Sequence, residues 1–118
     1  MNIHHIFEEL EKHDPGTFLD LESLNGYQIG AVSISGRAPV WEMHPDTDEL
    51  FVVLEGELEI TLREAEGPVV HHASAGSLFV VPKGIWHKPA APDGVRILYY
   101  TPGTTLHSES EDPLLETL

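Results

Sequence analysis

The chain has 118 residues, a length typical of one domain, and 20 acidic residues against 6 Lys and Arg, for a formal net charge of −14. This balance argues against nucleic acid or an anionic membrane as a partner, because both require basic patches. Cysteine is absent, so disulfides are excluded and a metal site must use nitrogen and oxygen ligands. The start of the chain lacks signal-peptide character and no apolar run approaches roughly 20 residues, so we expect a cytoplasmic protein without a membrane span.

Residues 1–25 predict a short N-terminal helix and an edge segment. Residues 4–12 form the expected helix, and Asp14-Pro15-Gly16 gives the turn that ends it. The apolar side chains at helical spacing are Ile3, Ile6, Phe7 and Leu10. Residues 17–24 are expected to form an edge strand, which Asn25-Gly26 ends with a tight turn.

Residues 26–103 predict an all-β domain, because short strands and turns alternate there without another helix. The expected strands are residues 27–35, 40–44, 50–54, 58–63, 69–72, 78–81, 85–88 and 95–101. Such spacing is typical of a β-sandwich or barrel. Residues 104–118 form an acidic tail, which is either frayed or lies on a neighbour through Leu114, Leu115 and Leu118.

Two runs, residues 36–56 and 76–91, carry polar residues that core packing does not explain. Glu42 and His44 are two apart on an expected strand, so their side chains share one face. A polar turn can fold Glu49 back toward them, and His87 arrives from a distant segment. Two imidazoles and two carboxylates suit a divalent transition metal.

Both runs resemble the two motifs of the cupin superfamily. The first motif, G-x5-H-x-H-x4-E-x6-G, is filled from Gly36 to Gly56, with Glu42 where the first histidine stands in the family. The second, G-x5-P-x-G-x2-H-x3-N, is matched from Gly76 onward, with Ala91 in place of the final asparagine. Residues 41–60 are also similar to a group described as mannose-6-phosphate-isomerase-like.

The resemblance implies an all-β jelly-roll barrel, also called a double-stranded β-helix, over residues 26–103. It also implies that the metal ligands are Glu42, His44, Glu49 and His87. Two carboxylates would leave a divalent ion near neutral charge, which favours Fe, Mn or Ni, with Zn also suitable, over soft Cu(I). Two alternatives stay open: Glu42 is a solvated strand residue beside a three-ligand site, or the fold is kept without its metal.

Other polar and aromatic residues are weaker candidates. Trp41 and Trp86 fall on the strand face opposite Glu42 and His87, as barrel wall or dimer contact. At most one of His71 and His72 can point toward the site, and His4, His5, His13 and His107 are expected at the surface. Either Tyr99, or Arg96 together with Tyr100, is expected to line a substrate pocket beside the metal ligands. An anionic substrate could be held by the metal, Arg37, Lys83, Lys88 or Arg96.

Family likeness leaves the function open between two classes, and with it the question of whether the protein is an enzyme. One is a metal-dependent enzyme, a dioxygenase, isomerase or lyase, acting on a small polar molecule. The other is a module that binds or senses a small molecule without turnover. Small cupins tend to pair, and the edge strand at residues 17–24 with the apolar helix face predicts a homodimer.

Overall fold

The structure, a computed structural model, describes the whole chain except residue 39, residues 102–103 and residues 116–118. Leu118 and the boundary predicted at residue 103 therefore lie outside the described residues. The elements are α1 (Ile6–Glu11), β1 (Leu19–Leu24), β2 (Tyr27–Arg37), β3 (Trp41–Met43), β4 (Glu49–Glu64), β5 (Gly67–Ser74), β6 (Leu78–Val81), β7 (His87–Thr101) and β8 (Leu106–Ser108). Within these residues, no helix has the length and apolar character that crossing a membrane requires.

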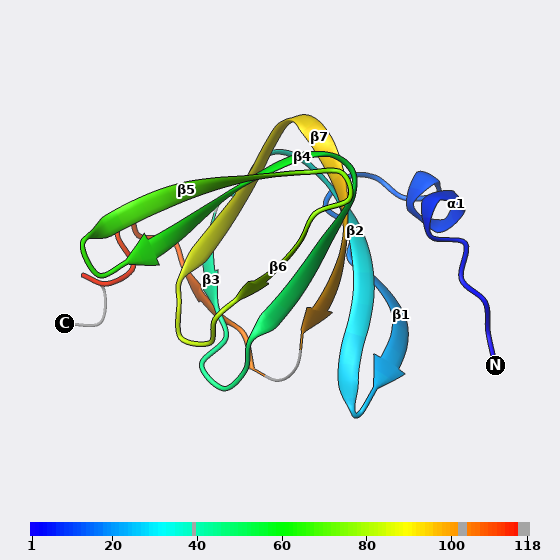
Figure 1. Cartoon of the computed structure of the whole chain (residues 1–118), viewed down its shortest axis with the longest axis horizontal. Helices are drawn as coiled ribbons and strands as arrows, with labels where there is room; N and C mark the ends of the chain where they lie inside the picture. The colour runs from blue at the N-terminus through cyan, green and yellow to red at the C-terminus, as the bar shows by residue number, and fades with distance from the viewer. Residues whose placement is uncertain (39, 102–103, 116–118) are drawn as a thin grey trace.

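The long strands β4 and β7 organise one antiparallel sheet that curls on itself (Figure 1). The later part of β7 pairs with β2, which in turn pairs with β1, and the first part of β4 pairs with β6. The other ends of the two strands extend the sheet to β3, β5 and β8. The result is the predicted all-β jelly roll with one short helix.

Each long strand replaces two strands that the sequence predicts separately. Residues 50–54 and 58–63 both belong to β4, and residues 95–101 belong to β7 together with the second half of the strand predicted at 85–88. The break expected between residues 54 and 58 is a bend instead of a turn: Gly56 has φ +84° and the β4–β7 register shifts there. A glycine in the left-handed region lets the strand bend while its pairing continues on both sides.

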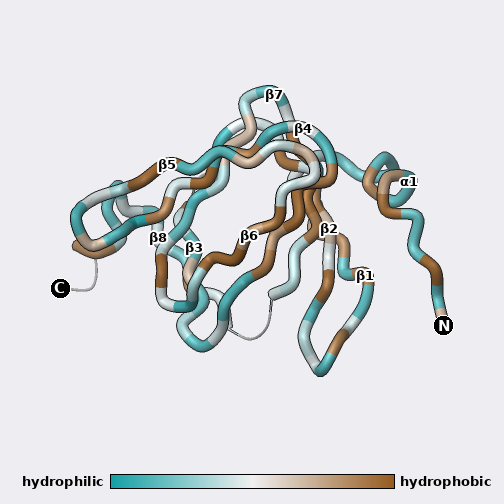
Figure 2. Tube along the Cα trace, viewed as in Figure 1, coloured by the Kyte–Doolittle hydropathy of each residue, from teal (hydrophilic) through white to brown (hydrophobic). Residues whose placement is uncertain are grey.

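The core lies inside the curl, between the facing parts of β2, β4 and β7. Its buried members include Val32, Val53, Leu58, Ile60 and Ile97. Figure 2 shows apolar stretches along these strands, while many of the turns are polar. Inward-facing residues alternate with exposed ones, as expected for strands with one buried face.

Helix α1 near the start of the chain and β8 near its end both pack on this sheet. Helix α1 lies beside β2, where it buries Leu10 and leaves Phe7 partly exposed with the Arg96 guanidinium 5.7 Å from its ring centre. At the other end, β8 falls within the expected acidic tail but pairs with β3. The Arg63 Nε–Asp112 Oδ1 contact of 2.9 Å anchors the residues that follow.

Candidate metal centre

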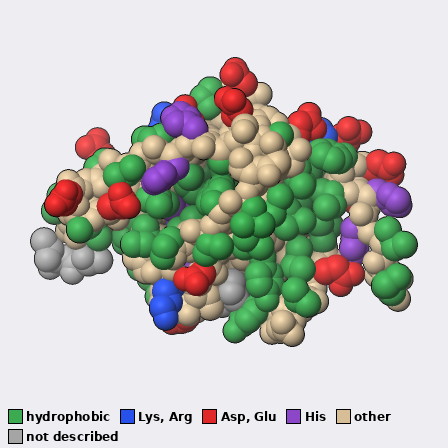
Figure 3. Space-filling model, viewed as in Figure 1, with side chains coloured by type: hydrophobic (Ala, Val, Ile, Leu, Met, Phe, Trp, Pro, Cys, Tyr) green, Lys and Arg blue, Asp and Glu red, His purple; other side chains and the backbone are tan. Residues whose placement is uncertain are grey.

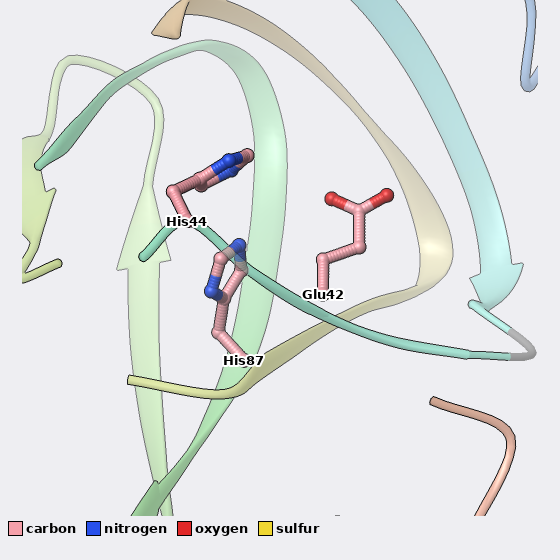
Figure 4. Close-up of side chains that lie close together, drawn as sticks. All are labelled: Glu42, His44 and His87. Carbon is pink, nitrogen blue, oxygen red and sulfur yellow. The ribbon is translucent and has the colours of Figure 1, made fainter. Parts of the chain in front are cut away.

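The start of β7 lies between β3 and β4, and this arrangement gathers the predicted site residues. Glu42 on β3 is the register partner of His87, which opens β7, while Leu62 of β4 lies on the other side of that histidine. His44 directly follows β3. One donor atom each from Glu42, His44 and His87 lie within 4.8 Å of one another. Figure 4 shows these three side chains pointing into one space.

Glu49, the first residue of β4, lies between the two histidines. Its Oε1 atom is 3.1 Å from His44 Nε2 and 3.2 Å from His87 Nε2. Thr101 Oγ1 donates a hydrogen bond to the other carboxylate oxygen. Glu49 is 5% exposed and His87 is 1% exposed, so these contacts are shielded from water. The structure thus brings all four predicted residues together.

Backbone carbonyl groups orient the two imidazole rings. Nδ1 of His44 lies 3.2 Å from the carbonyl oxygen of Thr104, and Nδ1 of His87 lies 3.1 Å from that of Ile85. A carbonyl oxygen only accepts, so each Nδ1 carries the donated proton and a neutral ring has its lone pair at Nε2. His87 Nε2 has no hydrogen-bond partner among the described residues despite its short distance to Glu49.

Burial and close contacts shift the pKa values of Glu49 and His44. Burial alone would raise the pKa of Glu49, but its polar contacts with His44, His87 and Thr101 outweigh burial and lower that pKa to about 2. For His44, burial lowers the pKa, but contacts led by the hydrogen bond and the charge of Glu49 together outweigh burial. The net effect is a pKa raised above the ordinary value of 6.5. Glu49 is therefore ionised at neutral pH.

His107 is exposed, as the sequence predicts, but it also lies beside the site. It lies on β8 as the register partner of Glu42, and its Nε2 atom is 3.4 Å from Glu42 Oε1. Both side chains line the same cavity. Residues 106–108 carry no strand signal in the sequence, so the pairing that brings His107 here could not be anticipated.

The cavity that holds this cluster has a volume of about 590 Å³. Its wall is mainly apolar and includes Val32, Ile34, Phe51, Ile97 and Tyr99. The sequence left open whether Tyr99, or Arg96 together with Tyr100, lines the pocket. The structure places Tyr99 on the cavity wall. Arg96 instead lies near Glu11 and Glu55, and the Tyr100 hydroxyl donates to the Leu24 carbonyl oxygen. Burial raises the pKa of Tyr99 to about 12, with a smaller contribution from nearby carboxylates, so its hydroxyl stays neutral.

The remaining candidates lie away from the cluster. Trp41 and Trp86 are buried and do not line the cavity, which fits the predicted role as barrel wall. His71 and His72 are exposed on β5, where His72 Nδ1 is 4.0 Å from Glu59 Oε1. Neither histidine reaches the cluster.

The donor set fits a divalent transition metal. Imidazole nitrogens and carboxylate oxygens are ligands that Fe, Mn, Ni and Zn accept, and the four side chains could hold such an ion. The carbonyl groups behind both rings are the outer contacts that fix ring orientation in protein metal sites.

Comparison with known proteins agrees with this fold. A cupin-domain family model matches residues 31–108. The chain is 46% identical over 81 residues to the uncharacterized protein YdbB of Bacillus subtilis strain 168, an alignment that spans 69% of this chain and 66% of YdbB, slightly under two thirds of its length.

Solved structures are also similar. A cupin-2 domain containing protein from Shewanella frigidimarina NCIMB 400 matches with a TM-score of 0.76 and 30% identity, over 86% of this chain and 95% of that one. Hydroquinone 1,2-dioxygenase PnpCD, in complex with Cd2+ and 4-hydroxybenzonitrile, matches with a TM-score of 0.70 and 19% identity, over 85% and 72% of the two chains. The second likeness shows the fold alone. Because the cupin family model matches more than half of this chain, the chain belongs to the cupin family.

Proposed function

We propose that the protein is a metal-dependent cupin enzyme that acts on a small organic molecule. Its metal would be a divalent Fe, Mn, Ni or Zn ion, with ligands Glu42, His44, Glu49 and His87. The observation that carries the proposal is the approach of two imidazole Nε2 atoms to one carboxylate oxygen of Glu49, at 3.1 and 3.2 Å.

This arrangement favours a bound cation. With each Nδ1 donating to a carbonyl oxygen, neutral rings of His44 and His87 direct lone pairs toward the same region as Glu49 Oε1. In a buried place, the lone pairs of the two Nε2 atoms and the negatively charged carboxylate oxygen repel each other. A proton on one Nε2 relieves one of these contacts, whereas a divalent ion accepts all three atoms.

Residues around the cluster prepare it for chemistry. A divalent ion held by these residues would supply Lewis-acid chemistry, or redox chemistry if the ion is redox-active. The Thr101 hydroxyl fixes the Glu49 carboxylate, and the neutral Tyr99 hydroxyl can donate a hydrogen bond to a bound molecule. The apolar wall excludes water from that molecule.

A non-catalytic binding module is the second candidate, and one observation favours it. Among the described residues of the cavity wall outside the cluster, the titratable side chains offer no free base. Tyr99 stays protonated and His107 is paired with Glu42. A module that captures a small molecule on the metal requires no such base.

Metal content is tested first. We expect elemental analysis of protein purified without added metal to give about one ion per chain. Replacing His44 and His87 together by alanine should abolish this ion while circular dichroism still reports a β-fold. The control is His71→Ala with His72→Ala, which removes two exposed histidines outside the site. Stoichiometric metal in the His44/His87 variant would refute the ligand assignment.

Turnover is tested next, on the metal-loaded protein. Oxygen uptake with hydroquinones, catechols, thiols and β-dicarbonyls tests dioxygenase chemistry, and product analysis without oxygen consumption tests isomerase and lyase chemistry. Saturable binding without turnover of any bound compound would favour the binding module. Kinship of residues 41–60 with mannose-6-phosphate-isomerase-like cupins stays a prediction and does not enter this proposal.

A further inference from the structure

Arg37 is a basic residue on the wall of the cavity that also holds Glu42 and Glu49. It is exposed, and no ion pair or hydrogen bond of its guanidinium is seen among the described residues. A guanidinium is always charged and offers five donors in a planar fork that matches a carboxylate. A free group of this kind beside a cavity is suited to hold part of a bound molecule.

The path of β2 explains why this side chain reaches the cavity. Val32 and Ile34 line the cavity from one face of the strand, so regular alternation would point Arg37 to the opposite face. The β2–β7 register shifts between Ile34 and Gly36, and Gly36 adopts φ +81°. This irregularity moves the alternation by one residue, so Ser35 and Arg37 also line the cavity.

Most of the other cations are engaged elsewhere. Of the six Lys and Arg residues, Lys12 contacts Glu9, Arg63 contacts Asp112, and Arg96 lies near Glu11 and Glu55. The Lys88 ammonium lies 5.6 Å from the centre of the Trp41 ring. On the face of the molecule drawn in Figure 3, red acidic side chains are more numerous than blue basic ones. A chain with net charge −14 therefore offers an anion very few sites, and one of them is this cavity.

The cavity itself combines three chemical regions. The apolar wall can enclose a hydrocarbon or aromatic body. A divalent ion would balance the charges of Glu42 and Glu49, so that they no longer repel an anion. The guanidinium of Arg37 then supplies the net positive charge at the wall.

We infer that Arg37 makes the cavity selective for molecules that join an apolar body to a carboxylate group. The guanidinium holds the carboxylate through charge-assisted hydrogen bonds, and the body lies along the apolar wall toward the His and Glu cluster. This inference rests on the proposed function, because the two site carboxylates need a metal to neutralise them. It deepens that function by assigning the substrate class.

Matched pairs of ligands test it. The probes are benzoate, phenylacetate and 3-phenylpropionate, each paired with its neutral amide of nearly the same shape. Binding to the metal-loaded protein is measured by titration calorimetry, and the metal in the same samples by elemental analysis. We expect at least one carboxylate to bind about tenfold more tightly than its amide, as a charge-assisted contact predicts.

Three variants assign the preference to Arg37. Arg37→Ala should remove the preference, and Arg37→Lys should keep part of it, because lysine retains the charge but not the planar fork. Lys83→Ala removes the same charge from an exposed residue outside the cavity and should leave the preference intact.

The possible failures are distinct. Equal binding of carboxylates and amides, no binding of any pair, or an unchanged preference in Arg37→Ala would each overturn the inference while the metal content stands. Protein that takes up no metal would instead refute the proposed function. Circular dichroism checks that each variant is folded.

Discussion

The Glu42 carboxylate lies 3.4 Å from His107 Nε2, across the pairing of β3 with β8. On its other side the same residue pairs in register with His87. Glu42 thus lies between a buried histidine of the cluster and a half-exposed histidine at the cavity wall. This placement gives the residue that departs from the family motif a fixed position beside the cluster.

Glu42 variants test whether this position makes it a ligand. Glu42→Ala should lower metal affinity at least tenfold, because one of the four donors is lost. Glu42→His should retain metal and shift the preference toward Zn(II) and Cu(II), since imidazole is a softer ligand than carboxylate. Competition with a chelator measures both effects. Unchanged affinity in Glu42→Ala would make Glu42 a plain strand residue.

His107→Ala tests the outer contact separately. An outer partner that orients a ligand typically contributes about 10–100-fold in metal affinity. We expect an effect at the lower end of this range, because His107 is half exposed and water can replace it. Chelator competition again gives the affinity. An effect larger than that of Glu42→Ala would mean that His107 itself binds the ion.

Metal affinity should fall as the pH is lowered. Protons and the ion compete for His44 Nε2, and the pKa of His44 is raised above 6.5 by Glu49 against the opposing effect of burial. Below this raised pKa the proton is bound and must be displaced, which costs up to about tenfold in affinity per pH unit. Glu49 does not contribute, because its pKa of about 2 keeps it ionised. Affinities measured between about pH 6 and 8 check this, and a flat profile would contradict it.

Gly56→Ala should destabilise the protein strongly. A Cβ at Gly56 would overlap the Gly94 carbonyl oxygen, and φ is +84°. The left-handed backbone costs about 1–2 kcal/mol and the overlap about 1–3 kcal/mol more. Gly76→Ala is a matched control, because Gly76 has φ +90° with open space around it and should show the backbone cost alone. Denaturant unfolding measures both, and equal losses would remove the overlap from the explanation.

The homodimer stays a prediction, and the structure suggests where to test it. β1 pairs with β2 alone among the described strands, and its last residue, Leu24, is half exposed. Light scattering at micromolar concentration should give roughly twice the chain mass of 13.1 kDa. Leu24→Asp should lower this to the monomer mass, while Val80→Asp on the opposite edge strand β6 should not. A wild-type mass near 13.1 kDa would refute pairing.

The sequence predicts the all-β fold, and strand geometry explains why it also indicates part of the cluster. Spacing along a strand sets which side chains share a face, so the interval from Glu42 to His44 and the turn before Glu49 carry real geometric information. The structure accordingly brings all four residues together. Ligation by a metal stays a prediction until metal is measured.

What the sequence misses depends on pairing between distant segments. His107 reaches the cavity because β8 pairs with β3, and its neighbours have no strand pattern. Arg37 faces the cavity because of a register shift opposite β7. The bend at Gly56 resembles a turn in the sequence, although the strand continues through it.

The central position of β4 and β7 in the sheet also determines which parts of the molecule unfold locally. Each has hydrogen-bonded neighbours on both sides over much of its length, whereas β1, β5, β6 and β8 each pair on one side among the described strands. Amide hydrogens at Phe51 and Ile97 should therefore exchange with solvent only through near-global unfolding, and those of the edge strands by local fraying. Glu49 and His87 stand at the ends of the slowly exchanging strands, while Glu42 stands on the short β3. Release of an enclosed ion would then begin at Glu42, as the first contact to separate.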